Sequence, residues 1–316
     1  MIKKLAMLSL VMILIVSSMT FSLSTTQAAV TIQEKTGKLG DANYIIQIPS
    51  NWNGRLVVCC RGFAHDLSQV NLRFYANSFS AMVQAGFAFA ISDYGSGGYC
   101  IKDGIIRTHQ LTEYVINNFH VSGKVYLIGI SMGATTALML GAKYPELYAG
   151  VLEIAGTKDI TSRYYAHSYY AGIEDDLELG SAVLDKGGVN PPFPCATIAD
   201  FRTFCTWSVE DVTTECGGTP DEKPKAYERI SPIDSAIDIA IPTISIHGTA
   251  DALAPYSQSI AFMDAVTTAG HANLYRLYKV VGGQHCDTPV MAQIAAKMPI
   301  LIGWSEYGVP PPPSSY

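Results

Sequence analysis

Residues 125–134 read VYLIGISMGA, a run of apolar, mostly strand-forming residues that ends in two glycines flanking a serine. The pattern G-x-S-x-G, here Gly129 to Gly133, is typical of a sharp turn from a strand into a helix that holds the serine clear of both elements. Ser131 is therefore either an ordinary turn residue or a nucleophile. A nucleophilic serine needs a base and an orienting carboxylate elsewhere in the chain.

The best candidate for the base is His285, in the sequence VVGGQHCD. It follows a predicted strand, on a glycine-rich loop far along the chain, where a fold with this turn places its base. The remaining histidines have structural interpretations; they are His65, His109, His120, His167, His247 and His271.

Asp251, in HGTADALAP, is the best candidate for the carboxylate. It comes just after a predicted strand and lies between Ser131 and His285 in the chain, and this order of serine, acid and histidine is typical of the fold. Asp159, which follows the preceding strand, is the alternative.

Such a site also needs two backbone N–H groups to bind a developing oxyanion. The residue after the nucleophile, Met132, should supply one of them. The second should come from the loop after an early strand, and in VVCCRGFAHD this strand ends at Cys60 and turns at Gly62. We therefore assign the second donor to Phe63.

Strand-like and helix-like segments alternate along the chain, and the strands are almost continuously apolar. This pattern predicts an α/β fold with a mostly parallel sheet covered by helices on both faces. We assign residues 29–156 and 228–308 to this core. The predicted strands are 43–49, 55–62, 86–94, 124–131, 148–156, 241–248 and 273–283, and the predicted helices are 103–120, 132–145 and 289–308.

Residues 157–227 interrupt the alternation, since they are rich in Tyr, Gly, Pro, Cys and acidic residues. We expect a cap of helices and loops over the carboxyl edge of the sheet. Its aromatic residues are the candidates for substrate contacts: Tyr164, Tyr165, Tyr169 and Trp207. The proline-rich tail, residues 309–316, should be extended.

The first 28 residues have a basic start, an apolar stretch and a polar exit with Thr26 and Ala28 before a cleavage point. This predicts a secretory signal peptide, with an uncleaved membrane anchor as the alternative. We expect a secreted or periplasmic protein without a stable membrane anchor after cleavage. The net charge of −6 argues against nucleic acid as a partner.

Export favours paired cysteines, and the chain has seven. We expect at least two of Cys195, Cys205 and Cys216 to be disulfide-bonded, with Cys205–Cys216 as one pairing and Cys195 free or linked to Cys100. Three reduced, buried thiols are the alternative. No CxxC pair has a matching Cys or His pair, so a structural zinc is not expected.

Four segments together resemble the α/β-hydrolase superfamily: RGF (61–63), GISMG (129–133), PTISIHGTADALAP (242–255) and GGQH (282–285). Residues 44–63 look like secreted esterases, and 228–251 are similar to prolyl-oligopeptidase-like and esterase members. One departure is Arg61, where the family usually has histidine before the oxyanion glycine. Another is Ile130, because relatives that link the triad by a disulfide have cysteine there, so Cys286 has no such partner.

The resemblance implies a serine hydrolase that cleaves carboxylic esters of small molecules. The predicted signal peptide adds secretion, and the aromatic residues of the cap suggest apolar or aromatic substrates. Ser131 would attack the carbonyl carbon, His285 would transfer the proton and Asp251 would orient His285. No metal or organic cofactor is implied. A peptidase, whose cap would bind an amine with Asp175, Asp176 and Glu178, and an acyltransferase are the alternatives on the same fold. A non-catalytic binding protein is a third.

Overall fold

The computed structural model describes residues 29–189, 192 and 194–312. The chain divides into two units, Met1–Thr31 and Ile32–Tyr316, and the fold below is that of the second unit. The predicted signal peptide, residues 1–28, lies outside the described residues and stays a prediction. No helix of the described part is long and apolar enough to cross a membrane.

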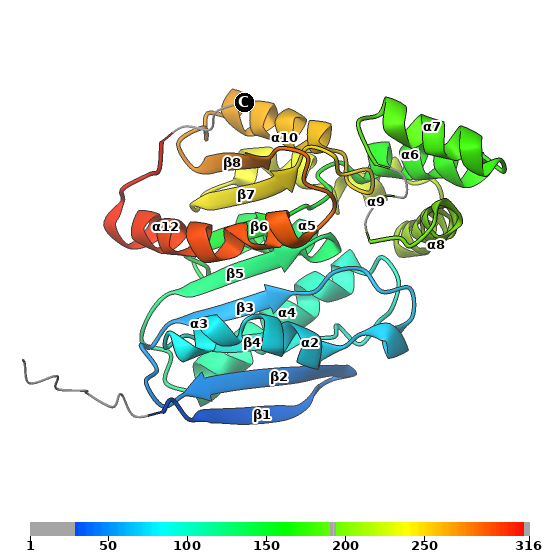
Figure 1. The fold of residues 1–316 in the computed structure, drawn as a ribbon. Helices are drawn as coiled ribbons and strands as arrows, with labels where there is room; N and C mark the ends of the chain where they lie inside the picture. The colour runs from blue at the N-terminus through cyan, green and yellow to red at the C-terminus, as the bar shows by residue number, and fades with distance from the viewer. Residues whose placement is uncertain (1–28, 190–191, 193, 313–316) are drawn as a thin grey trace, which may run out of the picture. The chain divides into compact units, whose positions relative to one another are not determined.

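An eight-stranded sheet forms the centre of the unit, in the order β1-β2-β4-β3-β5-β6-β7-β8. Pairs β1–β2 and β2–β4 are antiparallel and all the others are parallel, so the predicted mostly parallel sheet is confirmed (Figure 1). The strands are β1 (Ile32–Leu39), β2 (Ala42–Pro49), β3 (Leu56–Cys60), β4 (Ala88–Ser92), β5 (Val125–Ile130), β6 (Gly150–Ile154), β7 (Thr243–Gly248) and β8 (Tyr275–Val280).

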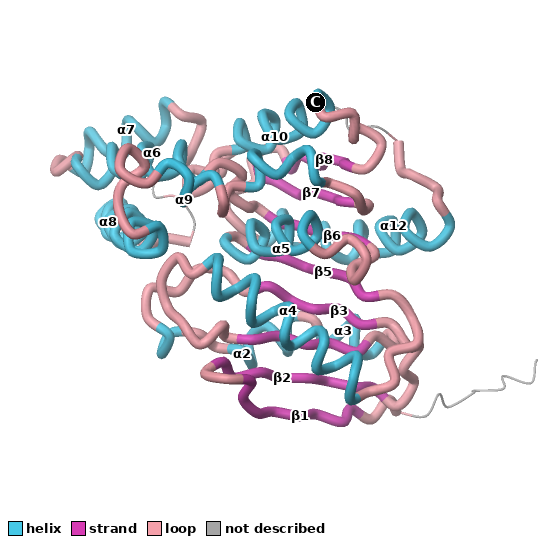
Figure 2. Tube along the Cα trace, turned by 180° about the vertical axis from the view of Figure 1, so that it is seen from behind, coloured by secondary structure: helices cyan, strands magenta, loops and turns pink. Residues whose placement is uncertain are grey.

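Helices cover both faces of the sheet, and strands β3 to β7 are therefore buried on both sides. On one face the apolar core includes residues of α4 (Ile101–Asn118), α5 (Met132–Lys143) and α10 (Tyr256–Thr268). On the other it includes residues of α2 (Leu72–Ser78), α3 (Ser80–Gln84) and α12 (Gln293–Tyr307). Figure 1 shows the second set in front of the sheet, and Figure 2 shows the first set from behind.

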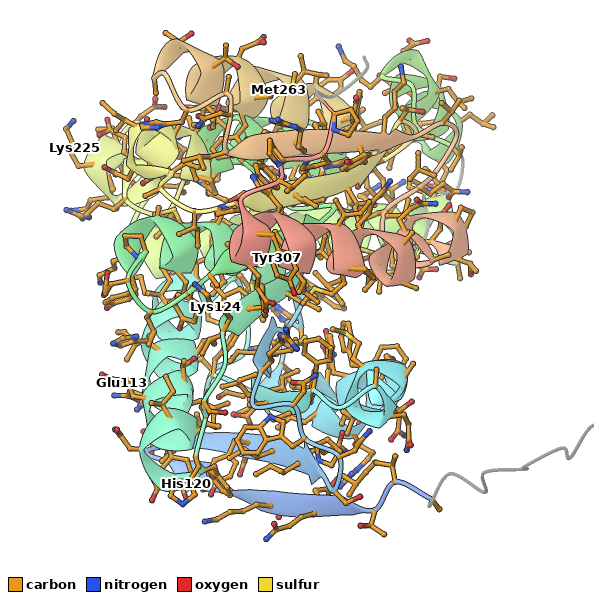
Figure 3. All side chains as sticks on the ribbon, turned by 90° about the vertical axis from the view of Figure 1, so that its left-hand side faces the viewer. Glu113, His120, Lys124, Lys225, Met263 and Tyr307 are labelled. Atoms are coloured by element: carbon orange, nitrogen blue, oxygen red, sulfur yellow. The ribbon has the colours of Figure 1, made fainter. Side chains whose placement is uncertain are left out.

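Helix α5 is buried on all sides from Met132 to Gly141, whereas α4 turns only one side towards the sheet. In α4, Ile101, Ile105 and Val115 are buried, whereas Glu113 is exposed and projects outward in Figure 3. Three short helices complete the core: α11 (Thr288–Met291) and the 3-10 helices η1 (Leu67–Gln69) and η2 (Pro232–Asp238). At the predicted extended tail, Arg276 Nε donates a hydrogen bond to the Pro311 carbonyl (3.0 Å).

The described part of residues 157–227 is helical, between β6 and β7. It contains α6 (Ile160–Gly172), α7 (Asp176–Asp185), α8 (Ile198–Cys216) and α9 (Pro224–Glu228). Figure 1 shows α6, α7 and α8 beyond the carboxyl ends of the parallel strands. Their shared apolar cluster includes Phe201 and Cys205 of α8 and also Leu253 of the core, so the cap packs directly on the loop that follows β7.

The prediction of a disulfide within the cap is wrong for this structure, because all seven cysteines are free. Cys205 and Cys216 belong to one continuous helix, α8. At a rise of 1.5 Å per residue they lie about 16 Å apart along its axis. A disulfide needs its two Cα atoms within about 7 Å. Cys100, the other partner considered, instead accepts a hydrogen bond at Sγ from Arg61 (3.2 Å).

We predict that all seven cysteines of the purified protein react with iodoacetamide under denaturing, non-reducing conditions, because every thiol is free. Intact-mass analysis should show seven added carbamidomethyl groups. A reduced and alkylated sample gives the reference mass. A lower number without reductant would contradict the structure, and peptide mapping would then identify the bonded pair.

Candidate active site

Ser131 lies at the turn between β5 and α5, with φ 56° and ψ −123°. This left-handed backbone is strained for a residue with a Cβ atom, so neighbouring structure must hold it. The flanking glycines make the turn possible. A Cβ atom on Gly129 would lie 2.3 Å from the Gly133 carbonyl oxygen, and one on Gly133 would lie 2.1 Å from the Cys60 carbonyl oxygen.

The structure brings Ser131, His285 and Asp251 together. Ser131 Oγ lies 2.8 Å from His285 Nε2, and His285 Nδ1 lies 2.7 Å from Asp251 Oδ2. Because a carboxylate can only accept, Nδ1 carries a proton and donates a hydrogen bond to Asp251. In the neutral form of His285, Nε2 is then the acceptor for the Ser131 hydroxyl. This is the arrangement in which a histidine can remove a proton from a serine.

Asp251 is held from several sides. Its Oδ1 atom accepts hydrogen bonds from the backbone N–H groups of Leu253 (2.9 Å) and Ala254 (2.8 Å). His247 Nε2 lies 3.3 Å from Asp251 Oδ2 and 2.7 Å from the Ala254 carbonyl oxygen. The Ser259 hydroxyl, 2.7 Å from Nδ1, fixes the other side of the His247 ring. Sequence analysis missed this contact of His247 with the carboxylate.

Asp159, the alternative carboxylate, lies elsewhere. It is the N-cap of α6, where its Oδ1 atom accepts a hydrogen bond from the backbone of Ser162 (3.0 Å). This is an ordinary capping role that satisfies a free N–H group of the first helical turn. The carboxylate on His285 is therefore that of Asp251.

The charges of the buried pair stabilise each other. Burial by itself would raise the pKa of Asp251, but His285 and His247 outweigh it and lower this pKa well below its usual range. Burial, the largest single effect, would lower the pKa of His285, but the Asp251 carboxylate and Cys286 together outweigh it and raise this pKa well above the ordinary value. Asp251 thus stabilises the imidazolium that would form when His285 accepts a proton.

The two proposed oxyanion donors flank Ser131. Within the described residues, neither the Met132 nor the Phe63 backbone N–H has a hydrogen-bond acceptor. The loop before Phe63 is close to the nucleophile, since a Cβ atom on Gly62 would lie 3.6 Å from Ser131 Cβ. Two free N–H groups beside a nucleophile are what an oxyanion hole requires.

Arg61 anchors this loop in place of the usual histidine. Its buried guanidinium donates hydrogen bonds to the carbonyl oxygens of Asp93 (3.0 Å), Gly62 (2.9 Å) and Ser96 (2.5 Å). It also lies 4.5 Å from the centre of the Tyr94 ring. Although Arg61 replaces the usual histidine, it still holds the oxyanion loop against the segment that follows β4.

Tyr75 of α2 is a further residue at the site that sequence analysis did not find. Its hydroxyl oxygen accepts a hydrogen bond from the Gly62 N–H (2.9 Å). Burial raises the pKa of Tyr75 to about 12, so the hydroxyl keeps its proton at neutral pH. No described residue accepts that proton. Tyr75 thus fixes the oxyanion loop and offers a hydroxyl donor beside it.

A pocket of about 290 Å³ opens at Ser131 and His285. Most of its wall is apolar: the lining includes Phe63, Phe74, Tyr75, Phe204, Leu253 and Met291. Phe204 comes from the cap helix α8, and its ring centre lies 5.4 Å from that of Phe63. The cap and the oxyanion loop therefore meet over the nucleophile.

The four cap aromatics predicted to bind substrate are not in the described lining of this pocket. Tyr164 packs against Tyr165 and Tyr227, and Tyr165 donates a hydrogen bond to Asp221 (2.8 Å). Tyr169 is 57% exposed. Trp207 stacks on His65 of the core, with ring centres 4.7 Å apart. Phe204, one helical turn before Trp207 on α8, is the aromatic residue of this helix that lines the pocket.

Two family models match the sequence. The model described as "Putative esterase" matches residues 106–193, and the model of the prolyl oligopeptidase family matches residues 194–293. The chain is a serine hydrolase of the α/β-hydrolase superfamily. No curated protein matches this hydrolase.

Solved structures share its fold at low sequence identity. Acylaminoacyl peptidase from Pyrococcus horikoshii has a TM-score of 0.57 and 13% identity, over 87% of this chain and 41% of that one. Puromycin hydrolase has a TM-score of 0.59 and 14% identity, over 89% of this chain and 40% of that one. Est1E from Butyrivibrio proteoclasticus has a TM-score of 0.55 and 13% identity, over 85% of this chain and 99% of that one. The hydrolase spans less than half of the first two proteins and nearly all of Est1E.

We predict that Asp251→Asn slows the labelling of Ser131 by a fluorophosphonate about 10⁴-fold at neutral pH, because His285 loses its orienting acceptor. The remaining labelling rate should begin to increase at a lower pH than in the wild type, since loss of the carboxylate lowers the pKa of His285. Rates of labelling across a pH series measure both effects. Asp159→Asn is the control and should behave as the wild type; the reverse pattern would assign the carboxylate to Asp159.

Tyr75→Phe should lower the rate of the same labelling about tenfold, because the Gly62 N–H loses its acceptor and the oxyanion loop its anchor. The free energy of unfolding should fall by about 1–3 kcal/mol for the unpaired buried group. Urea unfolding and labelling kinetics test the two effects. Tyr165→Phe, on the cap, is the matched control. An unchanged labelling rate in Tyr75→Phe would remove Tyr75 from the site.

Proposed function

We propose that this hydrolase is a secreted serine esterase that cleaves carboxylic esters of small molecules with apolar or aromatic groups. The observation that carries the proposal is the Ser131–His285 hydrogen bond of 2.8 Å at an apolar, aromatic pocket of about 290 Å³. A pocket of this kind accepts the apolar part of an ester, while the few polar groups at one end fix the carbonyl.

The reaction follows from the positions of these groups. Ser131 Oγ attacks the ester carbonyl carbon as its proton passes to His285 Nε2, and Asp251 stabilises the imidazolium. The Met132 and Phe63 N–H groups bind the oxyanion, and each such donor typically contributes about 3–4 kcal/mol. The alcohol leaves with the proton from His285. A water molecule that His285 deprotonates then attacks the acyl-enzyme carbonyl, releases the acid and restores Ser131.

Secretion is part of the proposal and is supported by the sequence of residues 1–28 alone, a basic start followed by an apolar stretch and small residues. After cleavage before Ala29, the enzyme would act outside the cytoplasm without a membrane anchor.

A peptidase is the second candidate, because the prolyl oligopeptidase model matches residues 194–293. Its cap would have to bind a substrate amine. Of the three acidic residues considered for this task, Glu178 is exposed on α7. The other two are already engaged: Asp175 caps α7 by accepting from the N–H groups of Leu177 and Glu178, and Asp176 forms an ion pair with Arg202. This favours the ester over the peptide as substrate.

We expect the protein to hydrolyse 4-nitrophenyl esters of increasing acyl length and to leave amino-acid 4-nitroanilides essentially uncleaved. Ser131→Ala should lower turnover by about 10⁵-fold or more with the fold intact, because the nucleophile is lost. Ser181→Ala, an exposed cap serine, is the control. Rapid anilide cleavage with weak ester cleavage would favour the peptidase, and a folded Ser131→Ala protein with wild-type turnover would refute the mechanism.

A further inference from the structure

Arg163, in the first turn of cap helix α6, is a buried cation without a counter-ion. Only 4% of its surface is exposed. Its guanidinium donates one hydrogen bond, to the Ser208 hydroxyl, and no carboxylate of the described residues comes within ion-pair distance. Buried charges in proteins are normally paired, because an unpaired one costs several kcal/mol.

Aromatic rings offset only part of this cost. The guanidinium carbon lies 4.4 Å from the centre of the Tyr99 ring and 5.9 Å from that of Phe204. Such contacts stabilise a cation, the more so when they are shielded from water. They occupy no N–H donor, however, and an arginine has five of them. The remaining donors have no acceptor among the described residues.

The nearest candidate for a protein counter-ion is Asp211, one turn after Ser208 on α8. Its carboxylate is 2.9 Å from His65 Nδ1, on the core loop. Arg163 lowers the pKa of Asp211, while burial, the larger effect, raises it, so the two charges are within electrostatic range without forming an ion pair. Asp211 is committed to the contact between cap and core and does not neutralise Arg163 directly.

A chain of hydrogen bonds connects Arg163 to the catalytic carboxylate. The Ser208 hydroxyl that accepts from Arg163 lies 2.9 Å from His167 Nδ1, and His167 Nε2 lies 3.0 Å from the Leu253 carbonyl oxygen. Nε2 must be the donor to this carbonyl, so Ser208 donates to Nδ1. The N–H of Leu253 in turn donates to Asp251 (2.9 Å).

The same neighbours place Arg163 at the substrate pocket. Leu253, at the end of this hydrogen-bond chain, and Phe204, beside the guanidinium, both line the pocket at Ser131. Arg163 therefore lies in the cap wall, directly behind the first layer of side chains. Arg163 itself is not in the described lining of the pocket, and the Phe204 ring lies between its guanidinium and the pocket.

We propose that Arg163 recognises an anion on the substrate, and that the ester cleaved by Ser131 carries one carboxylate; this rests on the proposed esterase function. A carboxylate matches the planar fork of a guanidinium with two parallel hydrogen bonds. The described lining of the pocket contains no lysine or arginine, so Arg163, behind Phe204, is the candidate cation. One cation balances the single charge of a carboxylate, whereas a phosphate monoester would bring excess charge into an apolar site.

Two matched pairs of esters test the proposal, one with the charge on the alcohol side and one with it on the acyl side. The first pair is 4-butanoyloxybenzoate and 4-butanoyloxybenzamide. The second is the 4-nitrophenyl monoester of adipic acid and its neutral amide analogue. We expect the wild type to prefer the anion in at least one pair by kcat/KM. Arg163→Met should lower kcat/KM for that anion about 10- to 100-fold and change the neutral partner little.

Arg202→Met is the control, because it removes another arginine from the same cap but one paired with Asp176 at the surface. It should keep the preference. Arg163→Lys should restore part of it, since the charge returns without the planar fork. Circular dichroism and thermal unfolding check the fold of each variant. Cleavage of the neutral esters with no preference for either anion would overturn the proposal and leave the esterase function standing.

Binding to the Ser131→Ala protein gives a readout independent of catalysis. Isothermal titration with 4-butoxybenzoate and 4-butoxybenzamide, ethers that cannot be hydrolysed, should show tighter binding of the anion. Adding Arg163→Met should remove the difference. If the wild type cleaves no ester, the proposed function fails, but binding of the carboxylate that depends on Arg163 would still support the anion site. Equal binding of both ethers, with or without Arg163, would count against it.

Discussion

The close approach of three backbone segments at Gly129 and Gly133 is the constraint on which the site depends. A Cβ atom at either position would lie within 2.3 Å of a backbone oxygen, so no side-chain rotation could relieve the clash. Because Gly133 packs on the carbonyl of Cys60, the contact ties the end of β3 to the start of α5. The same contact therefore sets the strained backbone of Ser131 and the separation of the two free N–H groups that flank it.

Two buried cations, Lys158 and Arg163, lie close together in the chain after β6 and differ in whether a carboxylate pairs with them. Lys158 is completely buried and lies 2.9 Å from the equally buried Glu153, and it also donates to the Gly156 carbonyl (2.7 Å). Burial lowers the pKa of Lys158, and Glu153 opposes this shift. This pair fixes the entry to the cap. Arg163, five residues later and inside α6, has no carboxylate of the described residues within ion-pair distance, and this contrast supports the proposed role in binding an anion.

The sequence was sufficient to predict that Ser131, Asp251 and His285 lie together, because each follows a strand and is recognisable locally. It failed where contacts depend on distant segments. Tyr75 reaches the site only through tertiary packing, and nothing in its local sequence indicates it. His247 lies only four residues before Asp251, but its contact with the carboxylate depends on the conformation of the turn between them. The polar edge strand β1 was missed because most of its residues face solvent. The disulfide prediction failed because composition did not reveal that Cys205 and Cys216 share one long helix.

The division between core and cap explains why reaction type was easier to predict than substrate. The core fixes the reacting groups through backbone geometry, which leaves a signature in the glycines and in the order of the catalytic residues. The cap contributes single side chains, such as Phe204 against Phe63 and Arg163 behind it, whose positions follow from how α6 and α8 pack. A substitution of Phe204 would change the wall of the pocket without removing any group of the Ser131–His285–Asp251 hydrogen bonds. Specificity can therefore change while the catalytic geometry stays the same.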